Sequence, residues 1–371
     1  MSCRGWSSDA YWAARITTEL ERAGHEVTLV CKDGTETRVI QRARETGATR
    51  IETLAFASGV QPASDVTDLR RLIGWLASVD LVHVHRGKEH WLAAIANRLA
   101  RTPRPLVRTR HITQPIRPHA LNRWLYRSAT SLVVTVTEAI RRQYVAGELL
   151  LPERVVTLRG GVDIERFRPS VDGTELRRAL DPAGKSPLIG LVSGLRVMKG
   201  HEVAVAAAAR LARGDRGFHM VLAGEGSFEP RIRQAIVSSG LTDRISVAGF
   251  IPDLPQAMAA FDIALYAAME SEGMSRVLFE YLAMGKPVVA SRVGVVPEVL
   301  EDGTTALLVP AGEAEALAQG IARLLDDAPL RARLGAAAAE LTHSRLSGAV
   351  VARELVTLYS RLCGQGGAPA P

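Results

Sequence analysis

The chain alternates short apolar runs with longer segments in which apolar residues recur at helical spacing. A helical pattern over residues 9–24 ends at Gly24, and the run HEVTLVC that follows it has the character of a short buried strand. Further β-rich runs follow at residues 80–85, 105–111 and 131–137, and a helical segment occupies residues 90–100. Strands that alternate with helices predict a parallel sheet of the α/β class.

The same alternation restarts in the second half, after a polar stretch that contains Pro169, Gly173, Pro182 and Gly184. Six short strands are expected there, at residues 187–195, 218–224, 245–250, 262–268, 287–291 and 306–310. An Ala- and Leu-rich helical tail runs from about Glu313 to Leu362. The pattern predicts two Rossmann-like, doubly wound domains that face each other across a cleft, with ligands outside the carboxyl ends of the strands.

The expected domain boundaries follow from this pattern. We expect an N-terminal domain at 1–168, a linker at 169–185, a C-terminal domain at 186–346, a last helix at 347–363 and a disordered tail at 364–371.

Composition excludes several classes of protein. Hydrophobic residues make up 47% and charged residues 23% of the 371, as in globular proteins and unlike disordered ones. Cys3, Cys31 and Cys363 are too scattered for a disulfide framework or a zinc site, and they suit a reducing cytoplasm. No apolar run reaches the roughly 18–20 residues that span a bilayer, and no signal pattern opens the chain. We therefore expect a cytoplasmic protein.

Charge is unevenly spread along the chain. Residues 1–170 carry 26 Lys and Arg against 17 Asp and Glu, a net +9, whereas the remainder carries a net −2. Residues 90–137 contain no acid and eight arginines: Arg98, Arg101, Arg104, Arg108, Arg110, Arg117, Arg123 and Arg127. An anionic partner and a merely solvated basic face are equally compatible with this segment. Nucleic acid is a weaker interpretation, because no binding motif or aromatic platform accompanies the charge.

The stretch ESEGMSRVLFEYLAMGKP holds two carboxylates, Glu272 and Glu280, where a loop turns into a helix. Eight helical residues rise about 12 Å, too far for the carboxyl pair of a glycosidase. A loop-to-helix anion site fits better, because Gly273 permits close approach and Ser275 is a candidate N-cap for a helix whose N–H groups face a diphosphate. Glu280 would then accept ribose hydroxyls. Taken alone, ordinary surface positions for both carboxylates are the commoner explanation.

The sequence around these two carboxylates resembles the glutamate-x7-glutamate signature of glycosyltransferase family 4. The members of that family are retaining nucleotide-sugar transferases with the GT-B architecture. The resemblance covers nearly the whole chain, because DLVHVH, RGGVDIERFRP, LRVMKGHE, LAGEGS and AGFIPDL occur in the family's order. It implies that Glu272 meets the donor sugar's hydroxyls and that Glu280 holds the ribose. Backbone donors near the distal phosphate and the sugar are implied at Gly273, Met274 and Ser275.

The resemblance implies further site residues. Lys199 matches the phosphate-binding lysine, whereas the family's arginine five residues earlier is Gly194 here, so that Arg196 is expected to substitute. Ordinary solvated cations are the alternative for both. His111 resembles the histidine near the reacting sugar, with a satisfied loop histidine as its alternative. The donor pocket is implied at Glu225, Gly226 and Phe250, and a phosphate loop at Gly5, Trp6 and Ser7.

The sequence favours neither a dinucleotide cofactor nor a metal site. GEGSFE fails the dinucleotide pattern, because Glu229 stands where the last glycine belongs. His83, His85 and His90 could suggest a metal site, but no acidic pair accompanies them, and structural or acceptor-side roles are favoured. We expect neither a metal nor a cofactor besides the nucleotide diphosphate sugar.

One departure from the family concerns the start of the chain. Met1-Ser2-Cys3 leads directly into the loop-like RGWSSDAYW, without the apolar strand that usually comes first and is usually central. We expect either that the natural start lies upstream or that the enzyme is weakened.

The sequence thus predicts a retaining, metal-independent glycosyl transfer. The acceptor, by analogy on the N-terminal domain, is expected to be an anionic envelope precursor such as lipopolysaccharide core or a lipid-linked glycan, with peripheral contact to the inner face of the membrane. Two alternatives remain: a nucleotide-sugar 2-epimerase of the same architecture, and a degenerate, non-catalytic nucleotide-sugar-binding subunit.

Overall fold

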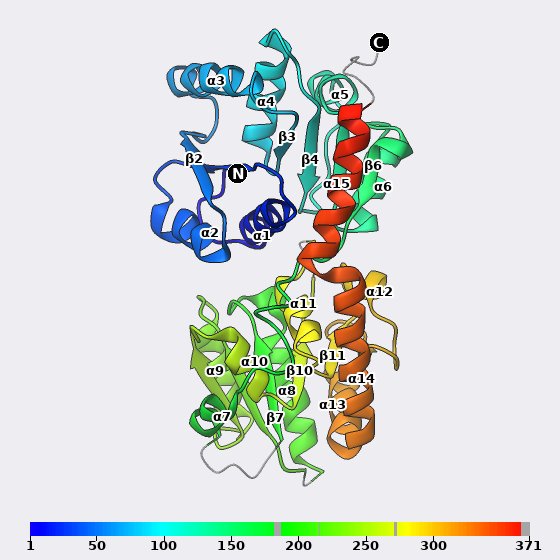
Figure 1. Cartoon of the computed structure of the whole chain (residues 1–371). Helices are drawn as coiled ribbons and strands as arrows, with labels where there is room; N and C mark the ends of the chain where they lie inside the picture. Colours follow the sequence, from blue (N-terminus) through cyan, green and yellow to red (C-terminus); the bar gives the residue numbers. More distant parts are fainter. Residues whose placement is uncertain (182–186, 215, 271–272, 365–371) are drawn as a thin grey trace. The chain divides into compact units, whose positions relative to one another are not determined.

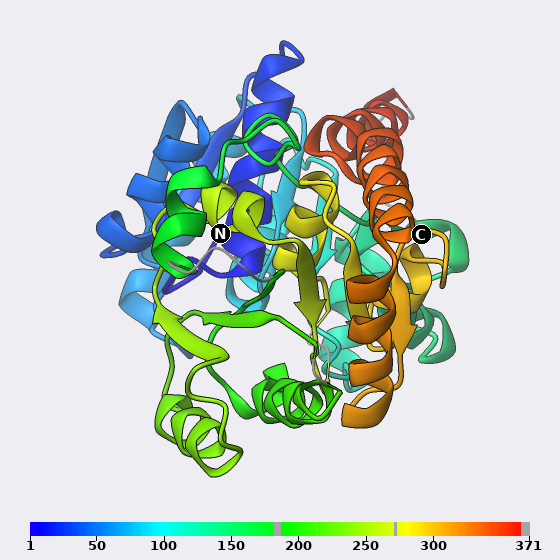
Figure 2. The ribbon, with the colours of Figure 1, turned by 90° about the horizontal axis from the view of Figure 1, so that it is seen from below.

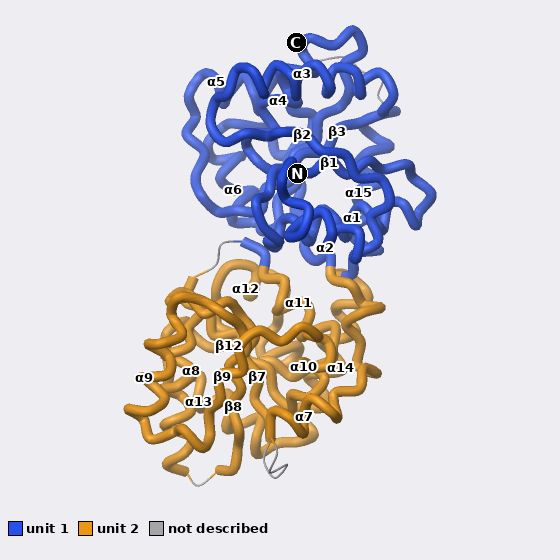
Figure 3. The backbone as a smooth tube through the Cα atoms, turned by 90° about the vertical axis from the view of Figure 1, so that its left-hand side faces the viewer, with its two compact units in different colours: residues 1–161, 272–274, 347–371 blue, residues 162–271, 275–346 orange. Residues whose placement is uncertain are grey.

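The computed structural model describes residues 1–181, 187–214, 216–270 and 273–364. It divides the chain into two compact units (Figure 3). Unit 1 comprises residues 1–161, 272–274 and 347–371, and unit 2 comprises residues 162–271 and 275–346. Every strand pair in both units is parallel, which confirms the α/β class.

Unit 1 contains two separate parallel sheets (Figure 1). The larger sheet has the order β3-β4-β5-β6, with bounds Val82–Val84, Leu106–Arg110, Leu132–Thr135 and Val155–Thr157. The smaller sheet pairs β1 with β2, at Thr28–Lys32 and Arg50–Leu54. The helices are α1 (Ser8–Arg22), α2 (Gln41–Thr46), α3 (Pro62–Leu76), α4 (Gly87–Leu99), α5 (Ala120–Arg123), α6 (Glu138–Ala146) and α15 (Gly348–Gly364).

The chain enters this unit through α1, and residues 1–7 form no strand. Met1 and Cys3 are nevertheless buried, and they pack against Leu29 and Cys31 of β1. Among the described residues, β1 pairs only with β2 and β3 only with β4, so the two sheets of unit 1 are not joined.

Helix α15, red in Figure 1, belongs to unit 1 although it ends the described chain. It packs along α1, because Val351 and Leu355 share an apolar cluster with Trp12 and Ile16. Gly348 makes the approach close, since a Cβ there would lie 3.1 Å from Nε of Arg15.

Unit 2 is built on one six-stranded parallel sheet with the order β12-β11-β10-β7-β8-β9. The strands are β7 (Leu188–Val192), β8 (His219–Ala223), β9 (Ile245–Gly249), β10 (Ile263–Tyr266), β11 (Val288–Ser291) and β12 (Leu307–Val309). The helices are α7 (Thr174–Leu180), α8 (His201–Ala212), α9 (Glu229–Ser238), α10 (Leu254–Ala260), α11 (Arg276–Ala283), α12 (Val296–Val299), α13 (Ala314–Asp326) and α14 (Ala328–Leu341). The strand order reverses between β7 and β10, and this switch point is where open α/β sheets bind ligands.

Two segments differ from the expected pattern. The polar stretch 169–185 contains helix α7, and Gly173 before it lies so close to α10 that a Cβ would be 2.4 Å from the backbone nitrogen of Ala260. The helical tail is interrupted between α13 and α14 (orange in Figure 2), where Asp327 accepts a hydrogen bond from the backbone N–H of Leu330 and so caps α14. Of the expected tail 364–371, all but Gly364 lies outside the described residues.

No helix in the described ranges is both long and apolar enough to cross a bilayer.

Candidate functional site

At the switch point of unit 2, a tyrosine side chain forms hydrogen bonds to the backbone of β7. Strands β7 and β10 pair at only two positions, through Ile189 and Gly190 of β7. Beyond them, the hydroxyl of buried Tyr281 on α11 accepts a 2.7 Å hydrogen bond from the backbone N–H of Val192 and donates to the carbonyl of Gly190. Because this bond replaces a missing strand partner, it fixes α11 at the carboxyl end of β7.

The loop after β7 packs against the segment that follows β10. The backbone N–H of Met269 donates to the carbonyl of Met198 at 2.8 Å. Gly200 has a φ of +71°, and a Cβ there would lie 1.9 Å from the carbonyl oxygen of Ala267. Only glycine fits this backbone conformation and this contact. The turn Val197–Lys199, which carries the predicted phosphate lysine, is therefore held beside residues 267–269, which follow β10.

The positive charge of Lys199 acts on His201 within unit 2. The imidazole of His201 is fully buried and lies 3.1 Å from the hydroxyl of Ser193. Burial, aided by the positive charge of Lys199, lowers the pKa of His201 to about 4. His201 is therefore neutral near neutral pH, and the loop carries its positive charge on partly buried Lys199 and exposed Arg196.

The predicted donor-pocket residues after β8 and β9 reach the same edge of the sheet. The carbonyl of Glu225 accepts the backbone N–H of Leu195 at 2.9 Å. Gly226 is required there, since a Cβ would lie 2.2 Å from the carbonyl oxygen of Leu195. Phe250 follows β9 and is 56% exposed, unusually high for a large apolar side chain. The carboxyl edge of the sheet thus carries two loops in close backbone contact, after β7 and β8, and one exposed aromatic ring after β9.

Helix α11 begins at the same edge. Ser275 occupies its N-cap position with an extended backbone, but its side chain forms no capping hydrogen bond, contrary to the expected role of this hydroxyl. The N–H groups of the first helical turn have no partners within the helix, and together with the helix dipole they favour an anion.

Glu280 lies one turn further along α11 and is 1% exposed. Its Oε1 is 3.0 Å from Nε of Arg276, whereas its Oε2 is buried without a hydrogen-bond partner among the described residues. Burial raises the pKa of Glu280, and the charges of Arg276 and Arg166 only partly offset that rise. The surface position that the sequence left open for Glu280 is wrong.

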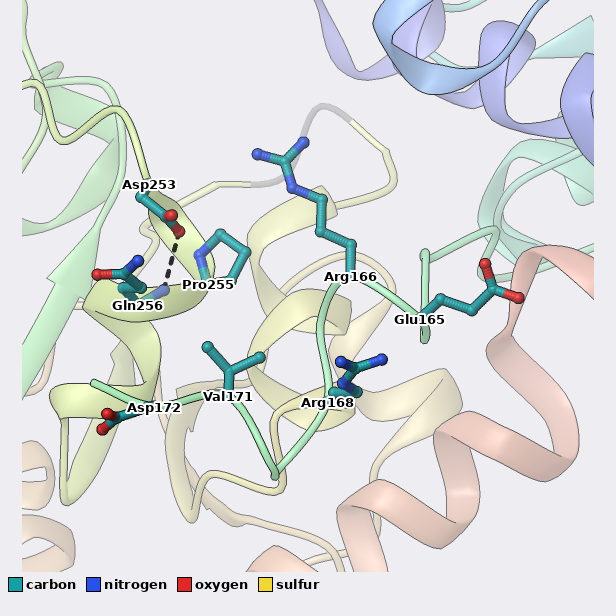
Figure 4. Close-up of a pocket in the computed structure, with 8 residues that line it drawn as sticks. All are labelled: Glu165, Arg166, Arg168, Val171, Asp172, Asp253, Pro255 and Gln256. Atoms are coloured by element: carbon teal, nitrogen blue, oxygen red, sulfur yellow. Dashed lines mark hydrogen bonds between the residues drawn. The ribbon is translucent and has the colours of Figure 1, made fainter. Parts of the chain in front are cut away.

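Unit 2 also contains a pocket of about 450 Å³ that Arg166 helps to line (Figure 4). It lies between residues 165–172 and the start of α10, where Asp253 accepts the backbone N–H of Gln256. In Figure 4 the side chain of Glu165 points away from Asp253 and Pro255. The pocket lies wholly within unit 2, and Glu165, Arg166 and Arg168 of its lining belong to the motif RGGVDIERFRP.

The segment of the signature that precedes α11 is divided between the two units. Glu272 lies outside the described residues. Gly273 and Met274 belong to unit 1, and Ser275 onwards belongs to unit 2. Gly273, with a φ of +132°, forms an isolated antiparallel bridge with Ile112, and a Cβ there would lie 2.1 Å from the carbonyl oxygen of His111. The structure thus brings the predicted Gly273 against the predicted His111.

His111 ends a row of stacked imidazoles in unit 1. Its Nε2 lies 3.2 Å from Nδ1 of His85, and the ring of His85 stacks on that of His83 with centroids 4.8 Å apart. His83 in turn contacts the hydroxyls of Thr109, at 2.6 Å, and Tyr359, at 2.5 Å. Burial lowers the pKa of His111 to about 4 and that of His83 to about 3. The row is therefore uncharged near neutral pH and packs as an aromatic stack.

The predicted phosphate loop lies just before α1. Ser7 is the N-cap residue of α1, and its hydroxyl donates a hydrogen bond to the carboxylate of Asp9. The rings of Trp6 and Tyr11 pack edge-on, with their centroids 6.2 Å apart. No heavy atom beyond its chain neighbours lies within 4 Å of a Cβ built at Gly5, so this glycine has open space around it.

Asp9 links this loop to His111 and α4. Burial alone would raise the pKa of Asp9, but the hydrogen bond from Arg86 and the nearby His111 hold it well below its usual range. The bond joins Nε of Arg86 to Oδ2 of Asp9 at 2.6 Å.

The basic segment 90–137 is not a uniform surface. Arg108 lies on β4 and is 3% exposed, and its Nε and Nη1 have no hydrogen-bond partner among the described residues. Arg108 is therefore not part of a solvated basic face, because a parallel strand that is covered on both sides buries the residues of both its faces. Within the described residues, no group of three or more His, Cys, Asp or Glu is arranged to hold a metal ion.

Sequence comparison identifies both halves of the chain. Residues 10–166 match the model described as Glycosyltransferase Family 4, and residues 186–327 match Glycosyl transferases group 1. A 2-deoxystreptamine glucosyltransferase from Streptomyces kanamyceticus is 31% identical over 319 residues, which cover 80% of this chain and 79% of that protein. The lipopolysaccharide core biosynthesis mannosyltransferase LpsB of Rhizobium meliloti is 29% identical over 54% of this chain and 59% of that protein. The chain spans about half the length of some curated relatives, such as 46% of an alpha-D-kanosaminyltransferase from S. kanamyceticus.

Solved structures share the architecture over nearly the full chain. A glycosyltransferase from Rickettsia africae ESF-5 has a TM-score of 0.84 at 21% identity, with 96% of this chain and 95% of that chain covered. HepE from Anabaena in complex with UDP has a TM-score of 0.82 at 22% identity, with 97% and 98% covered. At these identities the likeness shows the fold, which is GT-B. Together with the family models and the 31% identical relative, it places the chain in the family 4 type of GT-B glycosyltransferases.

Proposed function

We propose that the chain transfers a sugar from a nucleotide diphosphate sugar to a hydroxyl, with retention of the anomeric configuration. The donor would bind at the carboxyl edge of β7 to β10 in unit 2, where the loops after β7, β8 and β9 meet the start of α11. Structures of similar fold support this choice of donor, since HepE was solved in complex with UDP and with UDP-glucose.

One observation carries the proposal. The buried Oε2 of Glu280 is a charged acceptor without a donor among the described residues, and an unsatisfied buried carboxylate oxygen costs stability. The two adjacent hydroxyls of a ribose are donors that a carboxylate accepts in other nucleotide sites. A nucleotide whose ribose hydroxyls donate to Oε2 of Glu280 would remove this cost in the bound state, which accounts for a buried carboxylate that lacks a donor in the free protein.

The neighbouring groups suit the departing diphosphate. Lys199 and Arg196 supply positive charge from the loop after β7, and the first-turn amides of α11 supply aligned N–H donors. Donors and cations fixed before the reaction stabilise charge that develops on the leaving group without reorganisation. The acceptor hydroxyl would attack from the face that the diphosphate leaves, and a departing phosphate oxygen would take its proton, so that no protein nucleophile is needed.

His111 and Glu272 complete the proposed set on the side of the reacting sugar. His111 would meet the sugar as a neutral imidazole, because burial lowers its pKa to about 4. The acceptor would be a polyhydroxylated molecule of the cell envelope, such as lipopolysaccharide core or a lipid-linked glycan. A mannosyltransferase of lipopolysaccharide core biosynthesis among the relatives supports this choice.

The test is a panel of nucleotide diphosphates and nucleotide sugars in thermal-shift assays, followed by incubation of the stabilising donor with hydroxylated acceptors. Stabilisation follows ligand affinity, so the correct donor gives the largest shift. We expect a new glycoside whose anomeric proton coupling matches that of the donor. Consumption of the donor to an epimer without acceptor would overturn the proposal in favour of an epimerase, and binding without turnover in any acceptor screen would favour a non-catalytic binding protein.

A further inference from the structure

A pocket of about 350 Å³ lies wholly within unit 1. The end of β1, the loop after β2 and the first turn of α4 enclose it, together with residues 2 and 4. Its lining comprises four cationic side chains, namely Arg4, Lys32, Arg86 and Lys88, with Ser2 and residues 56–59. The volume is at the lower end of that of small-ligand pockets, which suits one chemical group of a ligand.

Charge in this pocket is not balanced. No Asp or Glu lines it. Arg86 pairs with Asp9, and Nζ of Lys88 lies 2.5 Å from Oδ1 of Asp65. Lys32 and Arg4 form no ion pair within the described ranges, so the pocket carries about two positive charges in excess. Four solvated cations would not be held together without cause, because like charges at short range repel each other.

Hydrogen bonds fix the cations around the cavity. Nζ of Lys32 donates to the carbonyls of Ala55 and Phe56, each at 2.9 Å, and Nζ of Lys88 donates to the carbonyl of Gly59 at 2.7 Å. Arg4 donates through Nη2 to the hydroxyl of Ser58. An ammonium group has three N–H donors, and these carbonyls take only two from Lys32.

The loop that receives these bonds is itself rigidly held. The carboxylate of Asp68, 2% exposed, accepts the backbone N–H of Ala55 at 3.0 Å and of Phe56 at 2.9 Å. Phe56 has a φ of +38°, a conformation that a bulky side chain rarely adopts and that persists only where surrounding contacts impose it. A strained, anchored loop bonded to cations from three separate segments is the construction of a pre-formed site.

The pocket communicates with the candidate reaction centre through one side chain. Arg86 lines the pocket and binds Asp9, and Asp9 in turn interacts electrostatically with His111. All three belong to unit 1. The Arg86–Asp9 ion pair would therefore lie between a ligand group bound in the pocket and a sugar bound at His111.

We propose that this pocket binds a phosphomonoester carried by the acceptor substrate. Convergent Arg and Lys side chains with spare donors match a doubly charged group with three terminal oxygens. The inference rests on the proposed function, because it treats unit 1 as the acceptor side. It narrows the acceptor to a phosphorylated one, either a soluble sugar or polyol phosphate or a phosphorylated lipid headgroup.

The test measures binding of inorganic phosphate and of glycerol 3-phosphate to the full chain by titration calorimetry. Variants are Arg4→Gln, Lys32→Gln and the pair combined, with exposed Arg101→Gln as the matched control for lost charge. We expect about tenfold weaker binding for each pocket cation removed and unchanged binding for the control, because each loss removes a charge-assisted hydrogen bond. Arg4 is exposed, so Arg4→Gln keeps the test valid if the double variant does not fold.

The source of the phosphate is decided in a second arm. Vesicles of phosphatidylcholine with and without phosphatidic acid are co-sedimented with the same variants. Binding in either arm that depends on Arg4 and Lys32 supports the proposal and names the source. Phosphate binding equal in the wild type, the double variant and Arg101→Gln would overturn it.

Nucleotide diphosphate binding is measured on each variant, and it separates this inference from the proposed function. We expect it to be unchanged, since neither Arg4 nor Lys32 is among the residues assigned to the donor. Loss of pocket phosphate binding with nucleotide binding intact concerns the acceptor pocket alone. Absence of nucleotide binding in the wild type concerns the proposed function alone, because phosphate titration of unit 1 can still be read.

Discussion

Replacement of Glu280 by Gln separates the functional and structural contributions of this carboxylate. Glutamine keeps the size of the side chain and removes its charge. In the wild type, Oε1 lies 3.0 Å from Nε of Arg276, and Oε2 is buried without a partner among the described residues. If Oε2 accepts ribose hydroxyls, the variant loses charge-assisted hydrogen bonds. Such bonds contribute about 1.5–3 kcal/mol each, so nucleotide diphosphate affinity should fall by roughly 10- to 100-fold.

Folding stability should respond in the opposite direction. Burial raises the folded-state pKa of Glu280 above its unfolded value, so the ionised group destabilises the fold once the pH rises above the unfolded value. Gln removes that cost, while Arg276, 27% exposed, can turn to water. The free variant should therefore be as stable as the wild type or up to about 1 kcal/mol more stable.

The assay combines urea unfolding of the free protein with calorimetric titration of nucleotide diphosphates. Glu298→Gln, on α12 of the same unit, is a matched loss of one carboxylate. We expect Glu298→Gln to keep wild-type affinity. A Glu280→Gln protein that binds nucleotide as tightly as the wild type but unfolds more easily would refute the reasoning, because Glu280 would then be a structural group.

Three further predictions test other parts of the account. Lys199→Met should lower kcat/KM by about 10²- to 10³-fold in a donor-turnover assay, since it removes charge stabilisation from the leaving diphosphate, and wild-type activity would contradict this role. Gly200→Ala should destabilise the chain by more than about 1 kcal/mol in urea unfolding, because its φ is +71° and the Cβ would lie 1.9 Å from the carbonyl oxygen of Ala267; an unchanged midpoint would show that the two loops separate freely. The unfolding free energy should fall as the pH drops from 6.5 towards 4, because burial lowers the folded-state pKa of His111 to about 4 and the unfolded state alone binds the proton in that window. His111→Gln should flatten this slope, and an equally steep slope in that variant would count against a neutral His111 in the folded protein.

Much of the fold could be predicted from the alternation of apolar and polar positions. Every expected strand from 80–85 to 306–310 contains a strand of the structure. Strand β2 was missed because RIETL carries alternating exposed positions and little apolar character, as befits a strand at the edge of a two-stranded sheet. The break before α14 had a local signal, since Asp327 is followed two residues later by Pro329, a typical helix start.

Only part of the candidate site could likewise be predicted from the sequence. Residues within contiguous motifs, such as Lys199 and Glu280, could be named from the sequence. Tyr281 could not, because its contact is with a strand almost ninety residues earlier in the chain. The cationic pocket of unit 1 was equally hidden, since residues at positions 4, 32, 56–59 and 86–88 meet only through the fold. Long-range pairing of this kind leaves no periodic trace in one sequence.

Hydrogen–deuterium exchange of the full chain, with and without a nucleotide diphosphate, tests most directly whether the carboxyl edge of β7 to β10 holds an activated sugar's diphosphate. The amides of residues 275–280 and 195–201 should exchange more slowly with a nucleotide diphosphate than with the corresponding nucleoside. Protection confined to other segments, or equal protection by the nucleoside, would contradict the account.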